Sequence, residues 1–456
     1  MNIDTRAQAQ HALNRYRQEV YRNALKRRRA ALFDLGEAVL TAPGRCNMAH
    51  LSLSPLFQRK WPSVPDALAD GRLAPGRIRA LIRPLIPQQT GGGRPVWAVD
   101  GTVFPRPQAE TSPERTYGHY RTAGIPRHGV IPAWEYQWLG MVPQTTGSWF
   151  LPLDVARRGI PAGKPTAVAI SQLRRVRHRQ PPGTPRPVVT FDSNYDVGDL
   201  ARAQHAPFPP QRLDLDVLVR VHPRRTFFRR PDPVAYAGRG RRPLHGAPFK
   251  LPDPTTQGEP DRAACVKDPR YGVVTVLVWA DLHPFGQADL SLTLVRVSAE
   301  PGPGGRRLKP LWLAWSGAGV PADPLDLWRW YRLRFVCEHL FRFLKQDLGW
   351  TTVRPRWPQA ADRWTWLLVL AIWHLWLARD LVADQPLPWE RSLPPGHLTP
   401  GRVRHALGPF LPGLTHPQAP VHSRGKSPGR ARGAGPGPRQ RFRVVKRPKK
   451  PPNVAA

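Results

Sequence analysis

Hydrophobic and polar positions follow a helical period early and late in the chain and strand-like patterns between these regions. Residues 7–40 are rich in Ala, Arg and Leu and contain no proline, which predicts helices. Residues 76–86 form a second basic segment that predicts another helix, and the apolar run over residues 364–383 predicts a buried one. Helical regions therefore flank a central part of different character.

Two short, unbroken apolar runs in this central part each stop at an aspartate. Residues 96–99 precede Asp100, and residues 188–191 precede Asp192. Such runs, ended by a turn, are typical of strands that are buried on both faces of a sheet. We therefore expect each aspartate at the end of a buried strand.

Further strands are expected around these two runs. Residues 130–153 alternate aromatic and aliphatic side chains with Gly and Pro turns, and residues 163–179 have the pattern of a basic helix. Strand-like runs follow at residues 214–221, 271–280 and 290–297, interrupted by a Pro/Gly-rich loop. This part of the chain predicts a β-rich insertion.

A charged stripe marks the helix predicted over residues 328–348. Tyr331, Arg334, Glu338 and Lys345 are spaced so that, at about 100° per residue, all four share one narrow face. The opposite arc is apolar, as expected for a helix that packs on a core. A carboxylate held between cations and a phenol on a rigid support suits phosphate chemistry.

The charge balance points to a polyanionic partner. The 456 residues include 69 Lys plus Arg against 32 Asp plus Glu, a formal net charge of +37. Such a charge opposes compaction unless a polyanion offsets it, so nucleic acid is the first partner to consider and an anionic membrane surface the second. We expect the partner to be double-stranded DNA. A solvated basic surface, or a GC-rich genome that favours arginine, accounts for part of the excess.

Several features bear on the compartment and on cofactors. The three cysteines lie far apart without a Cys-x-x-Cys pair, which favours a reducing interior. The most apolar window, residues 364–378, is short for a membrane span. Residues 425–427 resemble the end of a phosphate loop, but Pro420 replaces its first glycine. We expect a cytoplasmic, nucleoid-associated protein that uses neither a membrane nor ATP.

Asp100, Asp192 and Glu338 form a candidate metal site. Two carboxylates from adjacent strand ends and one from a helix can hold two Mg²⁺ ions about 4 Å apart, which activate a water or a 3′-hydroxyl for attack at phosphorus. Each residue also has a simpler explanation. The aspartates fit ordinary turns or caps, and Glu338 could merely pair with Arg334 and Arg342 on its helix. We favour the functional interpretation because the trio occurs together with the charged stripe.

The charged stripe resembles a signature of the DDE transposases of bacterial insertion sequences. One group of this family is marked by Tyr-(2)-Arg-(3)-Glu-(6)-Lys. The spacing from Tyr331 through Arg334 and Glu338 to Lys345 matches that signature at every position. The helix motif is fairly specific.

The two aspartate segments extend the resemblance over roughly residues 90–380. Trp97-Ala-Val-Asp100 and Val189-Thr-Phe-Asp192 look like the segments that carry the family's first and second aspartates. The resemblance implies a ribonuclease H-like core interrupted by a β-rich insertion. It also implies that both aspartates and Glu338 bind two Mg²⁺ ions, for which Mn²⁺ can substitute.

The same resemblance implies an activity and partners. Tyr331, Arg334 and Lys345 would contact phosphates near the cleaved end of a mobile element. Metal-dependent cleavage at terminal inverted repeats and strand transfer into target DNA would follow, in a synaptic complex built on a homodimer. Cut-and-paste DNA transposition is thus the function that the resemblance implies.

We therefore predict an α/β protein with a ribonuclease H-like catalytic core. Residues 1–87 would form a helical DNA-binding domain and residues 88–212 the first part of the core. A β-rich insertion would occupy residues 213–324, and residues 325–385 would complete the core with the signature helix. Residues 386–456 would form a Pro/Gly/Arg-rich, basic and largely disordered tail.

Two other functions remain open at this point. A transposase remnant without catalytic activity would bind DNA as a repressor or nucleoid component, but would be expected to have lost a carboxylate. A metal-dependent nuclease without strand transfer would keep the same residues. A strand-transfer assay separates this nuclease from a transposase.

Overall fold

The computed structural model describes most of the chain. The described residues are 3–42, 46–88, 93–120, 129–143, 147–159, 164–181, 183–208, 211–232, 241–302, 308–317, 323–394, 396–414, 417, 432–433, 435 and 437–446.

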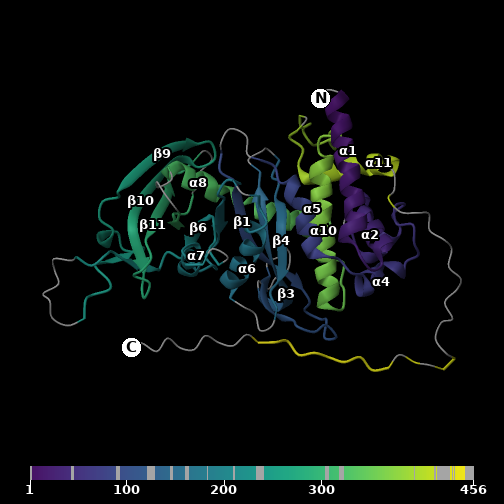
Figure 1. Ribbon diagram of the computed structural model, residues 1–456, viewed down its shortest axis with the longest axis horizontal. Helices are drawn as coiled ribbons and strands as arrows, with labels where there is room; N and C mark the ends of the chain where they lie inside the picture. Colours follow the sequence, from purple (N-terminus) through teal and green to yellow (C-terminus); the bar gives the residue numbers. More distant parts are fainter. Residues whose placement is uncertain are drawn as a thin grey trace.

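The N-terminal region is a group of helices that packs on the long apolar helix α10, Pro358–Ala378 (Figure 1). The tyrosine Tyr16 marks this contact, because its hydroxyl donates to the carbonyl of Leu370 at 2.8 Å. The N-terminal helical elements are α1 Ile3–Glu19, the π-helical turn η1 Val20–Ala24, α2 Arg29–Thr41, α3 Met48–Ser52, α4 Ser63–Asp70, α5 Pro75–Ile82 and η2 Arg83–Leu85. The expected helical region is present, interrupted at Arg28, where the backbone is left-handed with φ 57°.

One 12-stranded sheet runs through the described part of the chain, in the order β2-β3-β1-β5-β6-β12-β11-β10-β7-β8, with β4 paired to β3 and β9 to β10. Its strands are β1 Val96–Pro105, β2 Thr116–Tyr120, β3 Gly129–Val142, β4 Leu151–Arg157, β5 Val188–Phe191, β6 Asp216–Val221, β7 Thr226–Phe228, β8 Pro248–Lys250, β9 Arg262–Asp268, β10 Gly272–Pro284, β11 Leu292–Ala299 and β12 Leu311–Ser316. A short 3₁₀ turn, η4 Pro254–Thr256, follows β8.

The centre of the sheet is parallel and its flanks are antiparallel. β1, β5 and β6 run parallel to one another, whereas β3 and β4 on one side and β12 to β9 on the other are antiparallel. β6 lies after residue 213, the predicted start of the insertion, and is the parallel neighbour of β5. Its nearly continuous burial is typical of a central strand.

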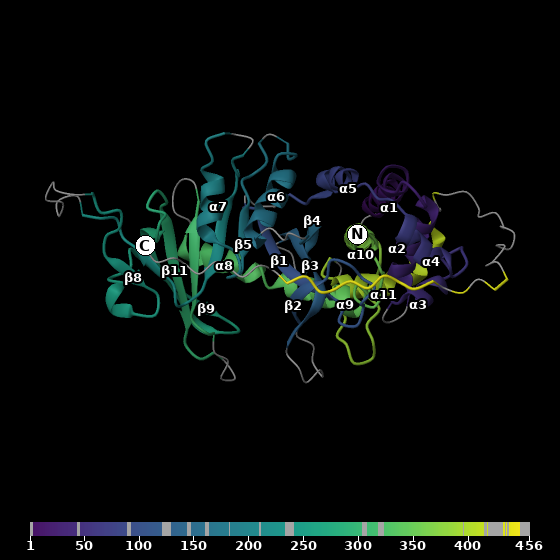
Figure 2. The same cartoon turned by 90° about the horizontal axis from the view of Figure 1, so that it is seen from below.

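Helices cover both faces of the sheet. Figure 2 shows α6, Pro165–Arg177, and α7, Val197–Gln204, on one face, and α8, Pro324–Leu333, and α9, Val336–Gln346, on the other. Both α8 and α9 contact β1. Among the described residues, no helix has the length and apolar character needed to cross a lipid bilayer.

The single helix predicted over residues 328–348 is wrong. α8 ends at Leu333, and a turn at Arg334 and Phe335 separates it from α9. α8 packs on the apolar core of the insertion strands, whereas α9 packs on the larger core shared with α10. A straight helix presents its apolar stripe to only one core, so the break lets this stretch contribute to both.

The tail predicted from residue 386 is not disordered at its start. α11, Pro400–Phe410, is capped by Thr399 and buries Val403 and Leu407, and a 3₁₀ turn, η6 Leu411–Gly413, follows it. Arg404 links α11 to α2 by donating to the carbonyl of Val39 at 3.1 Å. The Pro-rich composition of this region predicted disorder, but its apolar residues, such as Val403 and Leu407, are buried in a helix. Much of the remaining tail lies outside the described residues, so the prediction of disorder there is not tested.

Candidate active site

Two parallel strands bring Asp100 and Asp192 together. β1 and β5 pair through Ala98 and Thr190, and this register continued by two residues sets Asp100 opposite Asp192. Asp192 directly follows β5, as predicted. Asp100 is not at a strand end, because β1 continues to Pro105 along its antiparallel partner β3. The sequence pattern missed this continuation because the strand becomes more exposed beyond Val99.

Arg334 is the cation that contacts Asp100. Its Nη1 donates to Oδ2 of Asp100 at 2.7 Å, and the two side chains are 8% and 14% exposed. Burial raises the pKa of Asp100 to about 6; the charge of Arg334 opposes this rise and that of Asp192 adds to it. The carboxylates are thus close enough to repel each other, with an arginine partly compensating them.

Asp192 also shapes its own turn. Its Oδ1 accepts from the backbone N–H of Asn194 at 3.0 Å, and its Oδ2 accepts from the Asn194 side chain at 2.9 Å. The turn role considered from the sequence is therefore real. It leaves lone pairs on both oxygens, so this role does not conflict with a contact to a cation.

Lys345 and Tyr331 approach the same strand from α9 and α8. Nζ of Lys345 donates to Oγ1 of Thr102 at 2.7 Å and lies 5.9 Å from the ring centroid of Tyr120. Burial lowers the pKa of Lys345 to about 8. Tyr331 is 2% exposed, and its hydroxyl has no hydrogen-bond partner among the described residues. Thr102 is two residues from Asp100 on the same face of β1, so these side chains surround one stretch of strand.

Glu338 is not part of this arrangement. It lies exposed in the first turn of α9, and no hydrogen bond or ion pair joins it to Asp100 or Asp192. In the described part of the chain, no three His, Cys, Asp or Glu side chains are grouped closely enough to hold a metal ion. The turn at Arg334 changes the direction of the chain and places Arg334, rather than Glu338, beside Asp100.

A polar cluster on the other side of β1 was not predicted from the sequence. Arg158 contacts Oε1 of Gln137 at 2.9 Å, Glu135 at 3.2 Å and the hydroxyl of Tyr195 at 3.4 Å. It passes over Gly101 so closely that a Cβ there would lie 2.9 Å from its guanidinium. Nothing in the sequence marks Arg158 as a residue near the site. Tyr195 could have been considered, because it follows Asp192 by three residues.

Tyr195 connects this cluster to the two aspartates. Burial raises its pKa well above the ordinary value, with Arg158 opposing the rise and the charges of Asp100 and Asp192 adding to it. The phenol therefore remains protonated at neutral pH and can donate a hydrogen bond near the aspartates. Of the residues after Asp192, Asn194 hydrogen-bonds to Asp192 directly, and Tyr195 contacts Arg158.

The donor set fits a divalent cation in part. Asp100 and Asp192 supply carboxylate oxygens, the ligands that Mg²⁺ prefers. The pKa of Asp100 is raised mainly by burial, and the neighbouring charge of Asp192 adds to this rise. One oxygen of Asp100 is engaged by Arg334, and among the described residues no third carboxylate joins the pair. Two of the three residues predicted to bind metal thus lie close together.

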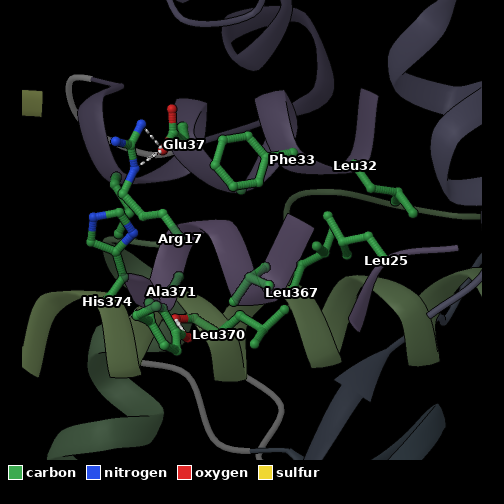
Figure 3. A pocket seen from close by; sticks show the side chains of 13 residues that line it. Arg17, Leu25, Leu32, Phe33, Glu37, Leu367, Leu370, Ala371 and His374 are labelled. Carbon is green, nitrogen blue, oxygen red and sulfur yellow. Dashed lines mark hydrogen bonds and ion pairs between the residues drawn. The ribbon is translucent and has the colours of Figure 1, made fainter. Parts of the chain in front are cut away.

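A small pocket lies elsewhere, between α1, α2 and α10 (Figure 3). Its cavity of about 30 Å³ is lined mainly by apolar side chains, with Arg17, Glu37 and His374 at one end. Burial, and to a smaller extent the charge of Arg17, lowers the pKa of His374 to about 3. A cavity near the size of one water, in a helical core, indicates packing rather than catalysis.

The mixed α/β fold with two adjacent carboxylates is compatible with a DDE nuclease. The family model of the DDE superfamily endonucleases matches residues 20–279, more than half of the chain. The chain therefore belongs to this family of DNA-cleaving enzymes, which typically use divalent metals. The matched range includes Asp100 and Asp192 and ends before Glu338. No curated protein matches the chain.

Proposed function

We propose that this protein is a DNA transposase of the Tyr-(2)-Arg-(3)-Glu-(6)-Lys group. It cleaves DNA at terminal inverted repeats and transfers the released 3′ ends into target DNA, with two copies of the chain in the synaptic complex. The observation that carries the proposal is the closeness of Asp100 and Asp192, which follow the paired parts of β1 and β5, together with the contact of Arg334 with Asp100.

The order of the central strands supports a ribonuclease H-like core. β4, β3, β1, β5 and β6 are neighbours in that order; β1, β5 and β6 pair in parallel, and β3 runs antiparallel to both of its neighbours, β1 and β4. In such an open sheet, functional side chains gather where neighbouring parallel strands end or separate. β1 and β5 separate just before the two aspartates, which agrees with a catalytic role for both.

Asp100, Asp192 and Glu338 would hold two Mg²⁺ ions in the proposed enzyme. When bound, the ions lower the pKa of a water or hydroxyl and stabilise charge at phosphorus. Glu338 lies in an exposed turn of α9, so its proposed role requires this turn to approach β1 when metal or DNA binds. Arg334 keeps the pair charged beforehand by neutralising part of the repulsion between Asp100 and Asp192.

The cations around β1 would position the DNA. Arg334 and Lys345 extend to Asp100 and Thr102, two positions on the same face of the strand. A phosphate placed there would accept hydrogen bonds from both and from the unpartnered hydroxyl of Tyr331. Uncharged Lys345 would hold such an anion less well, so its lowered pKa makes binding depend on pH.

The proposed function is tested with labelled duplexes from both DNA flanks of the gene. We expect binding without added metal, and Mg²⁺-dependent cleavage at inverted repeats followed by joining to a second DNA. Cleaved ends without joined products would favour the nuclease alternative. Binding without cleavage in Mg²⁺ or Mn²⁺ would favour the remnant and contradict the proposal.

A further inference from the structure

A short C-terminal segment returns to the catalytic part of the molecule. Residues 437–446, here called the strap, lie beside the start of β2 (Figure 2, yellow). The backbone N–H of Phe442 donates to the carbonyl of Glu110, and that of Val445 donates to the carbonyl of Arg115, both at 2.8 Å. The strap is therefore held by main-chain hydrogen bonds, in the manner of an added strand.

Arg115 makes this surface specific for an extended segment. It is 3% exposed, and its guanidinium donates to the carbonyls of Ser112 at 3.0 Å, Arg106 at 3.3 Å and Phe442 at 2.7 Å. Two of these acceptors come from the core and the third comes from the strap. Removing the strap would leave a donor of a buried arginine without that acceptor, which is costly.

The strap side chains alternate between the protein and the solvent. Phe442 is half-buried, with its ring 6.3 Å from that of Trp357 in an edge-on contact, and Val444 is also half-buried. Arg441 and Arg443 are exposed, and the 3.3 Å pair of Arg441 with Glu110 is open to solvent. Such a surface pair contributes little to stability, so the apolar and main-chain contacts hold the strap while its arginines remain available.

The direction of the strap leads toward the candidate active site. Val445 forms a parallel bridge with Thr116, the first residue of β2. β2 then extends over about 14 Å to Tyr120, whose ring lies 5.9 Å from Nζ of Lys345. Lys345 in turn contacts β1 beside Asp100. β2 thus connects the strap at one of its ends with the ring of Tyr120 and Lys345 at the other.

We propose that the strap is a docked phosphate-binding arm, which adds cations to the path of the DNA beside the active site. The ligand is the phosphate backbone of the DNA duplex. This inference rests on the proposed function and deepens it, since it identifies how a basic C-terminal region reaches the catalytic core. The docking surface comprises Glu110, Arg115, Thr116 and Trp357.

Two pairs of substitutions in the full-length protein separate docked charge from total charge. R441Q/R443Q removes two strap arginines and keeps Phe442, whereas R424Q/K426Q removes two cations from the region between α11 and the strap. Binding to a flanking-DNA duplex is measured in EDTA over a range of salt concentrations. We expect the strap pair to reduce the salt slope by up to about 2, at about 0.9 per lost phosphate contact. The matched pair should have less than half that effect, and equal effects would overturn the proposal.

Docking itself is measured by hydrogen exchange and by F442A with F442L as its conservative control. The amides of Phe442 and Val445 should be protected in the wild type and in F442L, and unprotected in F442A. F442A should also weaken DNA binding although no charge is lost. Unprotected amides in the wild type would contradict the docking of the strap. Full DNA affinity in F442A would contradict its role in DNA binding. Because binding is measured without metal, these results do not depend on cleavage, whose absence would contradict the proposed function instead.

Discussion

Two buried ion pairs with the same contact distance have different surroundings. Arg17 and Glu37 in the helical bundle meet at 2.7 Å with side chains 2% and 4% exposed, and Arg334 and Asp100 also meet at 2.7 Å. Burial raises the pKa of Glu37, and Arg17 opposes this rise. At Asp100 the charge of Asp192 acts in the same direction as burial.

The two ion pairs therefore differ in what surrounds them, one in a packed helical core and one in the proposed active site. The bundle pair lies in an apolar helical core, where a lost partner leaves a charge without compensation. Beside the site pair lies a second carboxylate, Asp192, whose charge opposes the ionisation of Asp100. Such a local conflict is expected where a protein gives up stability for chemistry.

The largest stability effect is expected from breaking the bundle pair. R17M leaves Glu37 buried without its cation, which should destabilise the protein by about 3–5 kcal/mol. Urea unfolding at pH 8, followed by tryptophan fluorescence, measures the change. R22M, at an exposed position of the adjacent helical turn, is the matched control. A loss below about 1 kcal/mol, within the range of surface pairs, would show that this pair is not structural.

D100N should have the opposite sign and stabilise the metal-free protein. The folded pKa of Asp100 is about 6, above its ordinary 3.8, so the folded state favours the neutral form. This costs stability as pH rises from about 4 to 6, and the full cost, about 3 kcal/mol at most, is present above pH 6. Urea unfolding in EDTA should show D100N more stable than the wild type at pH 8 and similar at pH 4. A D100N protein that is less stable than the wild type at pH 8 would contradict the raised pKa of Asp100.

His374 is another buried titratable residue of the helical bundle, and its pKa is lowered. Its folded pKa of about 3 lies below the ordinary 6.5, so the unfolded state takes up the proton first as pH falls. The free energy of unfolding therefore falls as pH decreases from 6.5 to 3, because only the unfolded state binds a proton at His374 over this range. H374L should therefore lose about 2 kcal/mol less than the wild type between pH 7 and pH 5. H397L, at an exposed histidine, should behave as the wild type does; equal acid sensitivity of all three would refute the buried neutral histidine.

The smallest effect is expected from Lys345. Its pKa of about 8 means that the ammonium is lost as pH rises from 7 to 9. DNA binding in EDTA should weaken over this range by the equivalent of about one phosphate contact, roughly 0.9 in the salt slope. K345R should remove this pH dependence because arginine stays charged. An identical pH profile for the wild type and K345R would exclude Lys345 from the DNA contact.

The sequence predicted much of the secondary structure but less of the site. Continuous apolar runs located β1 and β5, and their aspartates are neighbours because parallel strands share a register. Helical periodicity predicted one continuous helix where the structure has α8 and α9. The periodicity does not show that the apolar side chains of this stretch pack into two different cores. Arg158 and the strap were missed because their contacts depend on strands and turns far away in the chain.

The most direct test of the account is the rate of Mg²⁺-dependent cleavage of flanking DNA by D100N, D192N and D289N. Asp289 is an exposed aspartate in the loop between β10 and β11, and serves as the matched control. We predict that D100N and D192N lose at least about 10³-fold in rate, or about 4 kcal/mol of transition-state stabilisation, and still bind DNA. D289N should cleave as the wild type does. Cleavage by D100N and D192N at the wild-type rate would contradict the assignment of the aspartate pair as the catalytic centre.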